Sequence, residues 1–361
     1  MAAYNWPKIM EMKSNKELQE IIEGITLLNN EEAIAAAINE RNLREKNQVI
    51  PNDIEFPEKP EIGRINQTST KSLISLLLFI AALYFILSWN IYSIIIVAIV
   101  IIIHELGHFV AMKLYDYSDL SIFFIPMIGA LTSGNKKEVS QKQNTIISLA
   151  GPVPGIIIGT IFFIIGILIE NPLLTSIADI FIFINIFNLL PIQPLDGGKL
   201  VKILFFDDNI KINIVFLWVS IISIAAIAIY IESYILLIIP VALFFQIKQI
   251  SEIQKIKKIL ITKNYELNKN YEDLSNEEYW RIRDELATHM SAVVKLVKPN
   301  SRFEVPEEKR IVDIIKQFVQ KEPIKDMNGW MKVIVIISWL IVLVLPFIAL
   351  LILYLAGKMT F

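Results

Sequence analysis

Long apolar runs without a charged residue constrain this chain more than any other feature. The first extends from Ser72 to Ile103, 32 residues without Asp, Glu, Lys or Arg. As a single helix it would be about 48 Å long, whereas the hydrocarbon core of a bilayer is about 30 Å thick. We therefore expect it to break at Trp89-Asn90 into helices over 72–88 and 91–115.

Further apolar runs have the length of membrane spans, and the whole chain is 54% hydrophobic with a mean hydropathy of +0.54. This composition is too apolar for an ordinary soluble domain. We predict an all-α polytopic membrane protein with about seven transmembrane helices, the other five lying at 144–169, 172–195, 212–231, 233–247 and 333–357.

The stretch Ser121–Gly134 is apolar but too short to span a bilayer, and it contains Pro126 and Gly129. Non-helical backbone at membrane depth is tolerated only where protein covers it. We expect a re-entrant or strand-like hairpin here, at the membrane face.

The polar regions define four parts of the chain. We predict a cytosolic helical N-terminal region and linker over 1–71, a membrane-embedded core over 72–248, a cytosolic helical insert over 249–329 and a last transmembrane helix in 330–361. Basic residues flank alternate ends of the spans, and the first residues lack a cleavable signal peptide. We expect a cytosolic N-terminus and, since the chain is compact without a transit peptide, a bacterial inner membrane.

Charge and cysteine content exclude several functions. The 34 Lys and Arg residues nearly balance the 36 Asp and Glu residues, so nothing indicates a nucleic-acid partner. The chain has no cysteine, so a metal ion has only His, Asp and Glu as ligands.

The sequence HELGH at 104–108 lies within an apolar helix. Four residues apart, His104 and His108 project from one helix face at a separation suited to a single zinc ion. Glu105 lies beside that face and can act as the general base of a hydrolase. The competing interpretation is two histidines that make ordinary interhelical hydrogen bonds, but three ionisable groups in an apolar helix favour a functional role.

A catalytic zinc ion takes three protein ligands and leaves one position open. The best third candidate is Asp196 in NLLPIQPLDGG, where prolines end the preceding helix and two glycines let the backbone bend closely. The alternative is a solvated carboxylate at a helix-ending turn. With one zinc ion per chain, the predicted metal ligands are His104, His108 and Asp196.

Three motifs together resemble the site-2 protease family of membrane-embedded zinc peptidases. They are HELGHF from 104, SLAGPVPG over 148–155 and FNLLPIQPLDGGKL over 187–200, within a matching core from Leu77 to Ile247. The resemblance implies a zinc metalloendopeptidase of regulated intramembrane proteolysis, with the same three ligands and Glu105 as catalytic glutamate. Its substrate would be a transmembrane helix of another membrane protein, cut in or beside the bilayer.

One position departs from the family pattern. Many members carry Asn in a GPxxN motif, but this chain has Gly155 at that position. We therefore consider Asn188 as a substitute for that Asn in holding the substrate or the oxyanion. Asn144, Asn185 and Asn188 otherwise suit hydrogen bonds between helices.

Two ionisable residues lie outside this scheme. Asp179, inside an apolar run, is more consistent with a structural partnership than with a role in proton or water access. His289, in a polar segment, is expected to be a surface residue.

Two other functions remain open at this stage. A membrane-anchored HExxH protease that degrades damaged membrane proteins would use a soluble catalytic domain, which the apolar surroundings of HELGH disfavour. A metal-binding membrane scaffold or transporter without proteolytic activity would keep its function after loss of Glu105. The substrate, the regulatory trigger and the oligomeric state are not encoded in any recognisable pattern.

Overall fold

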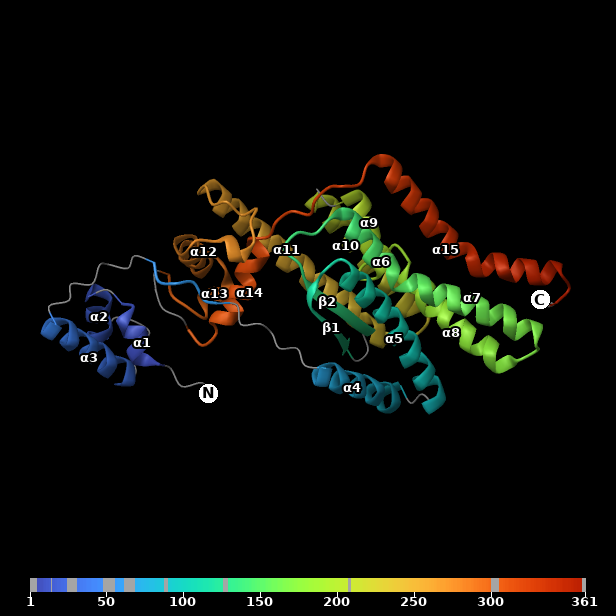
Figure 1. Cartoon of the computed structure of the whole chain (residues 1–361), viewed down its shortest axis with the longest axis horizontal. Coiled ribbons are helices and arrows are strands. Elements are labelled where there is room, and N and C mark those ends of the chain that lie inside the picture. Colours follow the sequence, from blue (N-terminus) through green and yellow to red (C-terminus); the bar gives the residue numbers. More distant parts are fainter. Residues whose placement is uncertain are drawn as a thin grey trace. The chain divides into compact units, whose positions relative to one another are not determined.

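The computed structural model describes residues 5–13, 15–24, 31–47, 56–61, 69–87, 90–125, 129–206, 209–299 and 305–358 (Figure 1). The chain forms two compact units, and each is described by itself. Unit 1 comprises Met1–Arg64 and Gln249–Glu322, and unit 2 comprises Ile65–Lys248 and Pro323–Phe361. Trp89 and Pro126 lie outside the described residues.

Unit 2 is a set of apolar helices with one small sheet. Its elements are α4 (Ser69–Leu87), α5 (Ile91–Leu114), β1 (Ser118–Ile125), β2 (Gly129–Asn135), α6 (Gln141–Ala150), α7 (Pro152–Leu168), α8 (Pro172–Asn188), α9 (Asp196–Val201), the π-helical turn η1 (Lys202–Phe206), α10 (Ile210–Tyr230), the 3₁₀ turn η2 (Tyr234–Leu237), the start of α11 (Ile238–Thr262) and α15 (Gly329–Leu355).

Five helical stretches are long and apolar enough to cross a membrane. They are α5, α6 continued by α7, α10, η2 continued by α11, and α15, with 24, 28, 21, 29 and 27 residues. Two shorter apolar helices cover 70–85 and 172–188. The expected mainly helical fold with several apolar helices of membrane-spanning length is therefore confirmed, whereas the count of seven spans stays a prediction.

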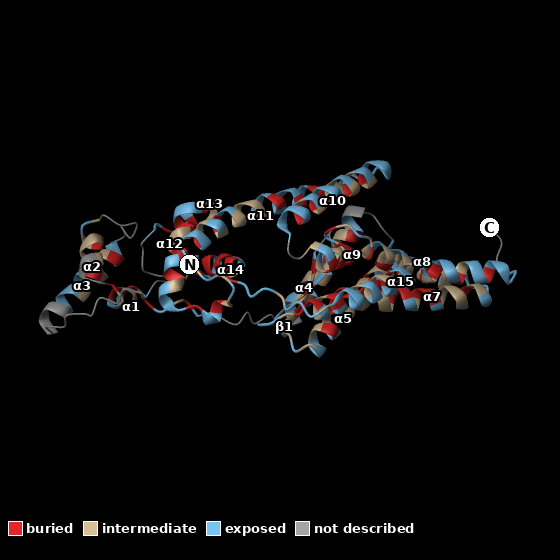
Figure 2. Cartoon of the chain, turned by 90° about the horizontal axis from the view of Figure 1, so that it is seen from above, coloured by how far each residue is buried: buried red, intermediate tan, exposed pale blue. Residues whose placement is uncertain are grey.

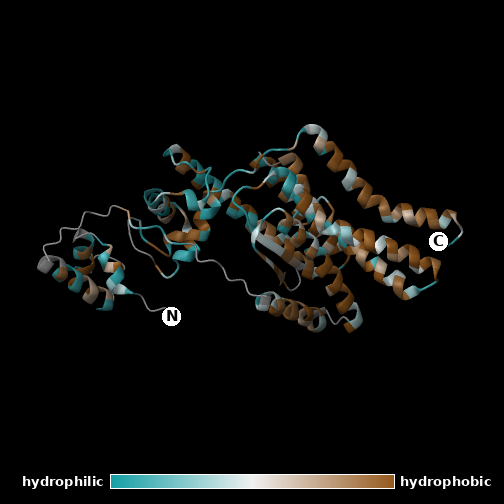
Figure 3. Ribbon diagram, viewed as in Figure 1, coloured by the Kyte–Doolittle hydropathy of each residue, from teal (hydrophilic) through white to brown (hydrophobic). Residues whose placement is uncertain are grey.

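These helices consist mostly of hydrophobic residues, as the brown colour in Figure 3 shows. Figure 2 marks many positions along these helices as exposed. Large hydrophobic side chains such as Phe85, Ile222 and Tyr230 are 78%, 65% and 89% exposed. Large apolar surface of this extent is rare in soluble proteins. It suits contact with lipid.

Local sequence signals set the helix ends. The expected break is present, since α4 ends at Leu87 and α5 begins at Ile91, where the Asn90 side chain accepts a hydrogen bond from the Ser93 amide at 2.8 Å. Such a side chain satisfies one of the amides that have no partner within the first turn of a helix.

Strands β1 and β2 form an antiparallel sheet in the region expected to be strand-like. Phe124 lies opposite Ala130, and Ile122 lies opposite Thr132. Phe124 also packs with Phe79 of α4 and Ile94 of α5 in one apolar cluster. The sheet is thereby fixed against the two helices.

A second apolar cluster lies beneath the loop that precedes α9. It joins Ile156 of α7, Leu189, Leu200 of α9, Leu204 and Trp339 of α15. Trp339 also donates from Nε1 to the carbonyl of Leu189 at 3.1 Å, both being buried. Helix α15 thus supports the loop leading to Asp196.

Unit 1 contains helices with mixed polar and apolar faces. They are α1 (Trp6–Glu11), α2 (Asn15–Ile22), α3 (Glu31–Asn47), the continuation of α11 from Gln249, the turn η3 (Tyr271–Asp273), α12 (Asn276–His289), α13 (Ser291–Val294) and α14 (Glu308–Phe318). Helices α1 to α3 share a small core around Met10, Leu18 and Ala37.

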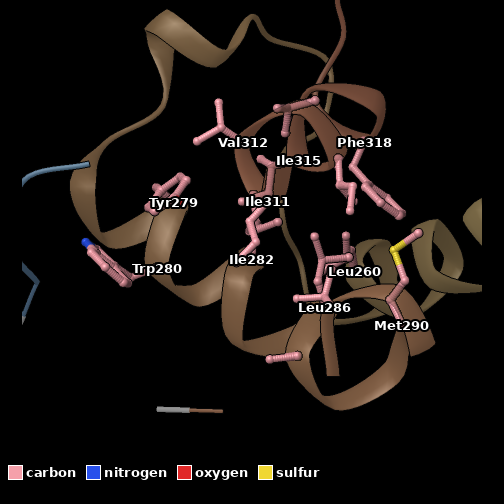
Figure 4. Packing of buried hydrophobic residues seen from close by; sticks show 14 of the residues in the cluster. Leu260, Tyr279, Trp280, Ile282, Leu286, Met290, Ile311, Val312, Ile315 and Phe318 are labelled. Atoms are coloured by element: carbon pink, nitrogen blue, oxygen red, sulfur yellow. The ribbon is translucent and has the colours of Figure 1, made fainter. Parts of the chain in front are cut away.

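The larger core of unit 1 joins α11, α12, α13 and α14 (Figure 4). A buried ion pair lies beside it, in which Arg283 Nε and Nη2 donate to the Glu308 carboxylate at 2.8 Å each. Tyr279 donates its hydroxyl to the same carboxylate. Burial, followed by the charge of Glu308, raises the pKa of Tyr279 well above its ordinary value.

Residues 57–60 are bound to this helical core. Trp280 donates from Nε1 to the carbonyl of Pro57 at 2.7 Å, and Tyr271 donates its hydroxyl to the carbonyl of Pro60 at 2.9 Å. The predicted linker is therefore an ordered part of unit 1 at these residues.

Candidate metal centre

Two histidines of α5 bring their outer ring nitrogens together. His104 and His108 are 5% and 7% exposed, and their Nε2 atoms lie 3.2 Å apart. They project from one face because residues four apart in an α-helix are stacked. The pair lies as the HELGH spacing predicts.

Asp196, the first residue of α9, completes a group of three candidate ligands. Its Oδ2 atom lies 3.0 Å from His104 Nε2 and 3.1 Å from His108 Nε2, and its side chain is buried. One ligand atom from each of the three residues lies within 4.8 Å of the others. The fold therefore brings together the three residues that the sequence singles out.

The hydrogen bonds of this group fit a bound cation. His108 Nδ1 lies 2.7 Å from the carbonyl of Ile147, which can only accept, so Nδ1 carries the proton. His104 Nδ1 lies 2.9 Å from Asn185 Oδ1. When both rings are neutral and protonated at Nδ1, each Nε2 keeps its lone pair and faces Asp196 Oδ2, which is the arrangement that a bound cation requires. A tetrahedral zinc ion bound at about 2.0–2.1 Å holds its ligand atoms roughly 3.3 Å apart, close to the spacing observed.

Lys199 forms an ion pair with the second carboxylate oxygen of Asp196. Its Nζ donates to Asp196 Oδ1 at 2.9 Å from one turn along α9, and the lysine itself is half-exposed. Because Oδ1 is bound in this way, only Oδ2 is directed to the two histidines. The arrangement favours a ligand that uses a single oxygen.

Gly197 and Gly198 are required by the packing of the preceding loop. A Cβ on Gly197 would lie 2.1 Å from the carbonyl oxygen of Leu189, and one on Gly198 would lie 2.4 Å from that of Ile192. Any side chain at either position would push the loop away from α9. These glycines thus allow the close bend that presents Asp196.

The junction between α6 and α7 approaches α5 at two further glycines. A Cβ on Gly107 would lie 2.0 Å from the carbonyl oxygen of Ala150, and one on Gly151 would lie 2.3 Å from His108 Nε2. The contact is thus a close backbone approach of the kind that small residues permit between membrane helices. It places the Ile147 carbonyl against His108.

Glu105 is buried beside the histidines and contacts the sheet. The hydroxyl group of Thr132 in β2 donates to Glu105 Oε2 at 2.7 Å, and its oxygen also lies 3.1 Å from the backbone carbonyl oxygen of Glu105. Glu105 and Thr132 are 5% and 7% exposed. The strand therefore holds the carboxylate that sequence reasoning assigned as the base, and Thr132 is a contact the sequence alone did not indicate.

The other residues singled out in the sequence lie apart from this group. Asp179 is exposed on α8, and no described residue forms a hydrogen bond or ion pair with it, so the structural partner we expected is not found in the described part of the chain. His289 ends α12 in unit 1 and lies 3.6 Å from Glu285. Asn188 donates to the Ile184 carbonyl of its own helix, whereas Asn185 contacts His104.

Known proteins resemble parts of this chain. Residues 92–179 match Peptidase family M50. A zinc metalloprotease of Methanocaldococcus jannaschii is 29% identical over 107 residues, which are 28% of this chain and 31% of that protein. Stage IV sporulation protein FB of Bacillus subtilis is 29% identical over 133 residues, 36% of this chain and 45% of that protein. The solved site-2 protease of M. jannaschii aligns with 50% of this chain and 88% of its own, at 22% identity and a TM-score of 0.37.

The aligned regions span less than half the length of these curated relatives. The family match nevertheless includes all of HELGH and the Gly151 junction that holds His108. The site-2 protease resemblance of the sequence motifs is thereby confirmed over residues 92–179, the segment that is similar to Peptidase family M50.

Proposed function

We propose that this protein is a zinc-dependent intramembrane endopeptidase that hydrolyses peptide bonds in or beside transmembrane segments of other membrane proteins. The observation that carries the proposal is the convergence of His104 Nε2, His108 Nε2 and Asp196 Oδ2 next to a buried Glu105 on a helix long enough to cross a bilayer. This is the residue set of a hydrolytic metal site with one position left for water.

Each residue has a separate role in the proposed reaction. His104, His108 and Asp196 would hold a zinc ion, which when bound would supply Lewis-acid chemistry toward a water molecule and the scissile carbonyl. Glu105 takes the proton from the attacking water and passes it to the leaving amine. Thr132 keeps the Glu105 carboxylate in place by donating to Oε2.

The sheet offers a position for an extended substrate. The Phe124 amide donates to Ser75 Oγ of α4 at 3.1 Å, so the outer edge of β1 is covered there. Since amides alternate between the two edges of a strand, the register directs the backbone groups of Ala130 and Thr132 toward the outer edge of β2. In the described part of the chain no backbone partner occupies that edge.

A substrate segment that pairs with this edge would lie beside the base. A transmembrane helix hides its peptide groups in its own hydrogen bonds, so it must unwind locally before it is cut. Addition of the unwound segment to an open strand edge replaces those hydrogen bonds. Thr132 would pair with the substrate through its backbone, and its side chain contacts Glu105. A substrate strand paired at Thr132 would therefore have its scissile carbonyl close to the proposed base.

The proposed arrangement in the membrane follows the distribution of charge. The five long helices and the two shorter apolar ones together make seven spans, with the N-terminus, the region 1–71 and the insert 249–329 in the cytosol. Basic residues near alternate helix ends, among them Lys71, Lys113 and Lys332, support this orientation. We propose the inner membrane of a bacterium as the location.

The decisive experiment measures zinc content and cleavage of a panel of single-pass membrane helices by the purified full chain. We expect about one zinc ion per chain and cleavage by the native protein. Glu105→Gln should keep zinc and lose cleavage, whereas Asp196→Ala should lose zinc affinity. His289→Ala and Asp179→Asn serve as matched controls, since each removes the same type of group away from the site.

Two results would refute the proposal. Cleavage that is indifferent to Glu105→Gln would remove the assigned chemistry. A zinc-loaded native protein that captures single-pass helices or carries ions, equally well with and without Glu105, would instead identify a scaffold or transporter.

A further inference from the structure

Asn185 is a fully buried amide that touches a candidate metal ligand. It lies on α8 with 0% exposure, and its Oδ1 atom is 2.9 Å from His104 Nδ1. Its Nδ2 atom donates to the carbonyl of Phe181 in the preceding turn at 2.8 Å. Both ends of the amide are therefore engaged.

The contact with Phe181 fixes which way the amide points. A backbone carbonyl can only accept, so the NH₂ group of Asn185 must face Phe181 and the oxygen must face His104. An amide oxygen also only accepts, so His104 Nδ1 carries the proton. His104 Nε2, which faces Asp196 and His108, is then left with its lone pair free for a metal ion.

The space for this amide exists because position 155 has no side chain. A Cβ on Gly155 of α7 would lie 2.1 Å from Asn185 Nδ2, 2.4 Å from Cγ and 2.6 Å from Oδ1. Helix α7 thus packs directly against the Asn185 amide at Gly155, and the Phe181 carbonyl accepts a hydrogen bond from its NH₂ group. Asn185 is confined in the orientation that serves His104.

We propose that Asn185 is a positioning residue that fixes the tautomer and ring orientation of His104, and that Gly155 is kept small to admit it. The inference rests on the proposed metal site and deepens it. Ligating histidines are generally oriented by a partner on their other nitrogen, and losing that partner costs about 10–100-fold in metal affinity or activity. For His108 the partner is the Ile147 carbonyl, which side-chain substitution cannot remove.

Asn188 provides a matched control. It is the same residue type, one turn further along the same helix, and its Nδ2 donates to the Ile184 carbonyl at 3.0 Å just as Asn185 donates to Phe181. No hydrogen bond links it to His104 in the described structure. A comparison of the two positions separates the contact with the ligand from any general effect on α8.

The test is zinc affinity of the full-length protein in detergent, measured by competition with a chelator, together with thermal unfolding of the zinc-free protein. Asn185→Leu keeps the approximate volume but removes the acceptor, and we expect zinc affinity to fall by about 10–100-fold. Asn188→Leu should keep native affinity. Gly155→Ala, which leaves the amide intact but displaces it, should weaken zinc binding in the same direction as Asn185→Leu.

Two outcomes would overturn the inference. The first is a folded Asn185→Leu variant that binds zinc with native affinity. If Asn185→Leu does not fold, native zinc affinity in Gly155→Ala has the same meaning. The other is an equal loss of affinity in Asn188→Leu, which would assign the effect to α8 as a whole. Because the readout is metal affinity, it is distinct from the proposed function, which fails instead when the zinc-loaded native protein does not cleave.

Discussion

We expect replacement of Gly151 by alanine to perturb the candidate metal centre, because this position lies very close to His108. A Cβ at this position would lie 2.3 Å from His108 Nε2, 2.6 Å from Cε1 and 2.8 Å from Cδ2, whereas ordinary contacts begin at 3.4 Å. The imidazole would have to retreat by about 1 Å, the difference between the shortest of these distances and an ordinary contact. At Gly151 φ and ψ are −71° and −64°, in the right-handed helical region. Because Pro152 follows, a Cβ at this position also meets the proline ring, so alanine adds backbone strain to the clash with the imidazole.

His108 cannot retreat without cost, because its Nδ1 is bound to the Ile147 carbonyl at 2.7 Å on the same helix pair. A shift of about 1 Å breaks this hydrogen bond or moves Nε2 away from Asp196. Loss of an orienting contact costs about 10–100-fold in metal affinity. Misplacement of a catalytic group by about 1 Å costs about 100-fold in rate.

Zinc affinity by chelator competition and turnover at saturating zinc together measure the two effects of Gly151→Ala. We expect affinity to fall by at least about tenfold and turnover of the loaded protein by about 100-fold. Gly329→Ala is the control, since a Cβ there meets nothing within 4 Å. Native affinity and native turnover in Gly151→Ala would refute the inferred geometry of His108.

Three further outcomes are expected. Thr132→Val removes the hydroxyl that holds Glu105 and should lower kcat about tenfold with zinc content unchanged. Thr132→Ser, which keeps the hydroxyl, should retain activity. A valine variant with the native kcat would count against the contact. Arg283→Met leaves the Glu308 carboxylate buried without its cation and should destabilise unit 1 by about 3–5 kcal/mol, measured by denaturant titration. Arg281 is half-exposed, so the control Arg281→Met should change the free energy of unfolding by under about 0.5 kcal/mol. Removal of metal with a chelator should abolish cleavage and lower the unfolding temperature, and zinc should restore both; unchanged cleavage without metal would exclude the proposed chemistry.

The helices of unit 2 could be predicted because their signals are local. Charge-free runs determine where a chain can cross a bilayer, and the Asn90 cap separates α4 from α5 as expected. Hydropathy does not determine where a helix stops. Helix α11 continues to Thr262, beyond the span expected over 233–247, because the residues after Lys248 remain good helix formers with an apolar stripe that enters the core of unit 1 at Ile256 and Leu260.

The candidate metal ligands could likewise be predicted from local spacing, whereas the contacts that support them could not. His104 and His108 are one helical turn apart, and the bend at Asp196 is encoded by its own prolines and glycines. Thr132 and Asn185 lie 27 and 81 residues from the groups they hold. Nothing in the immediate sequence of either residue indicates these contacts, since they depend on the register of β2 and on the packing of α8.

The glycines of the α6–α7 junction connect helix packing with ligand placement. Gly151 and Gly155 are four residues apart and therefore lie on one face of the continuous helix. The first leaves room for the His108 ring, and the second leaves room for the amide of Asn185 that orients His104. The same absence of side chains that lets α7 approach its neighbours thus sets the position of both histidines. Alanine at either position should accordingly weaken zinc binding, through His108 at 151 and through His104 at 155.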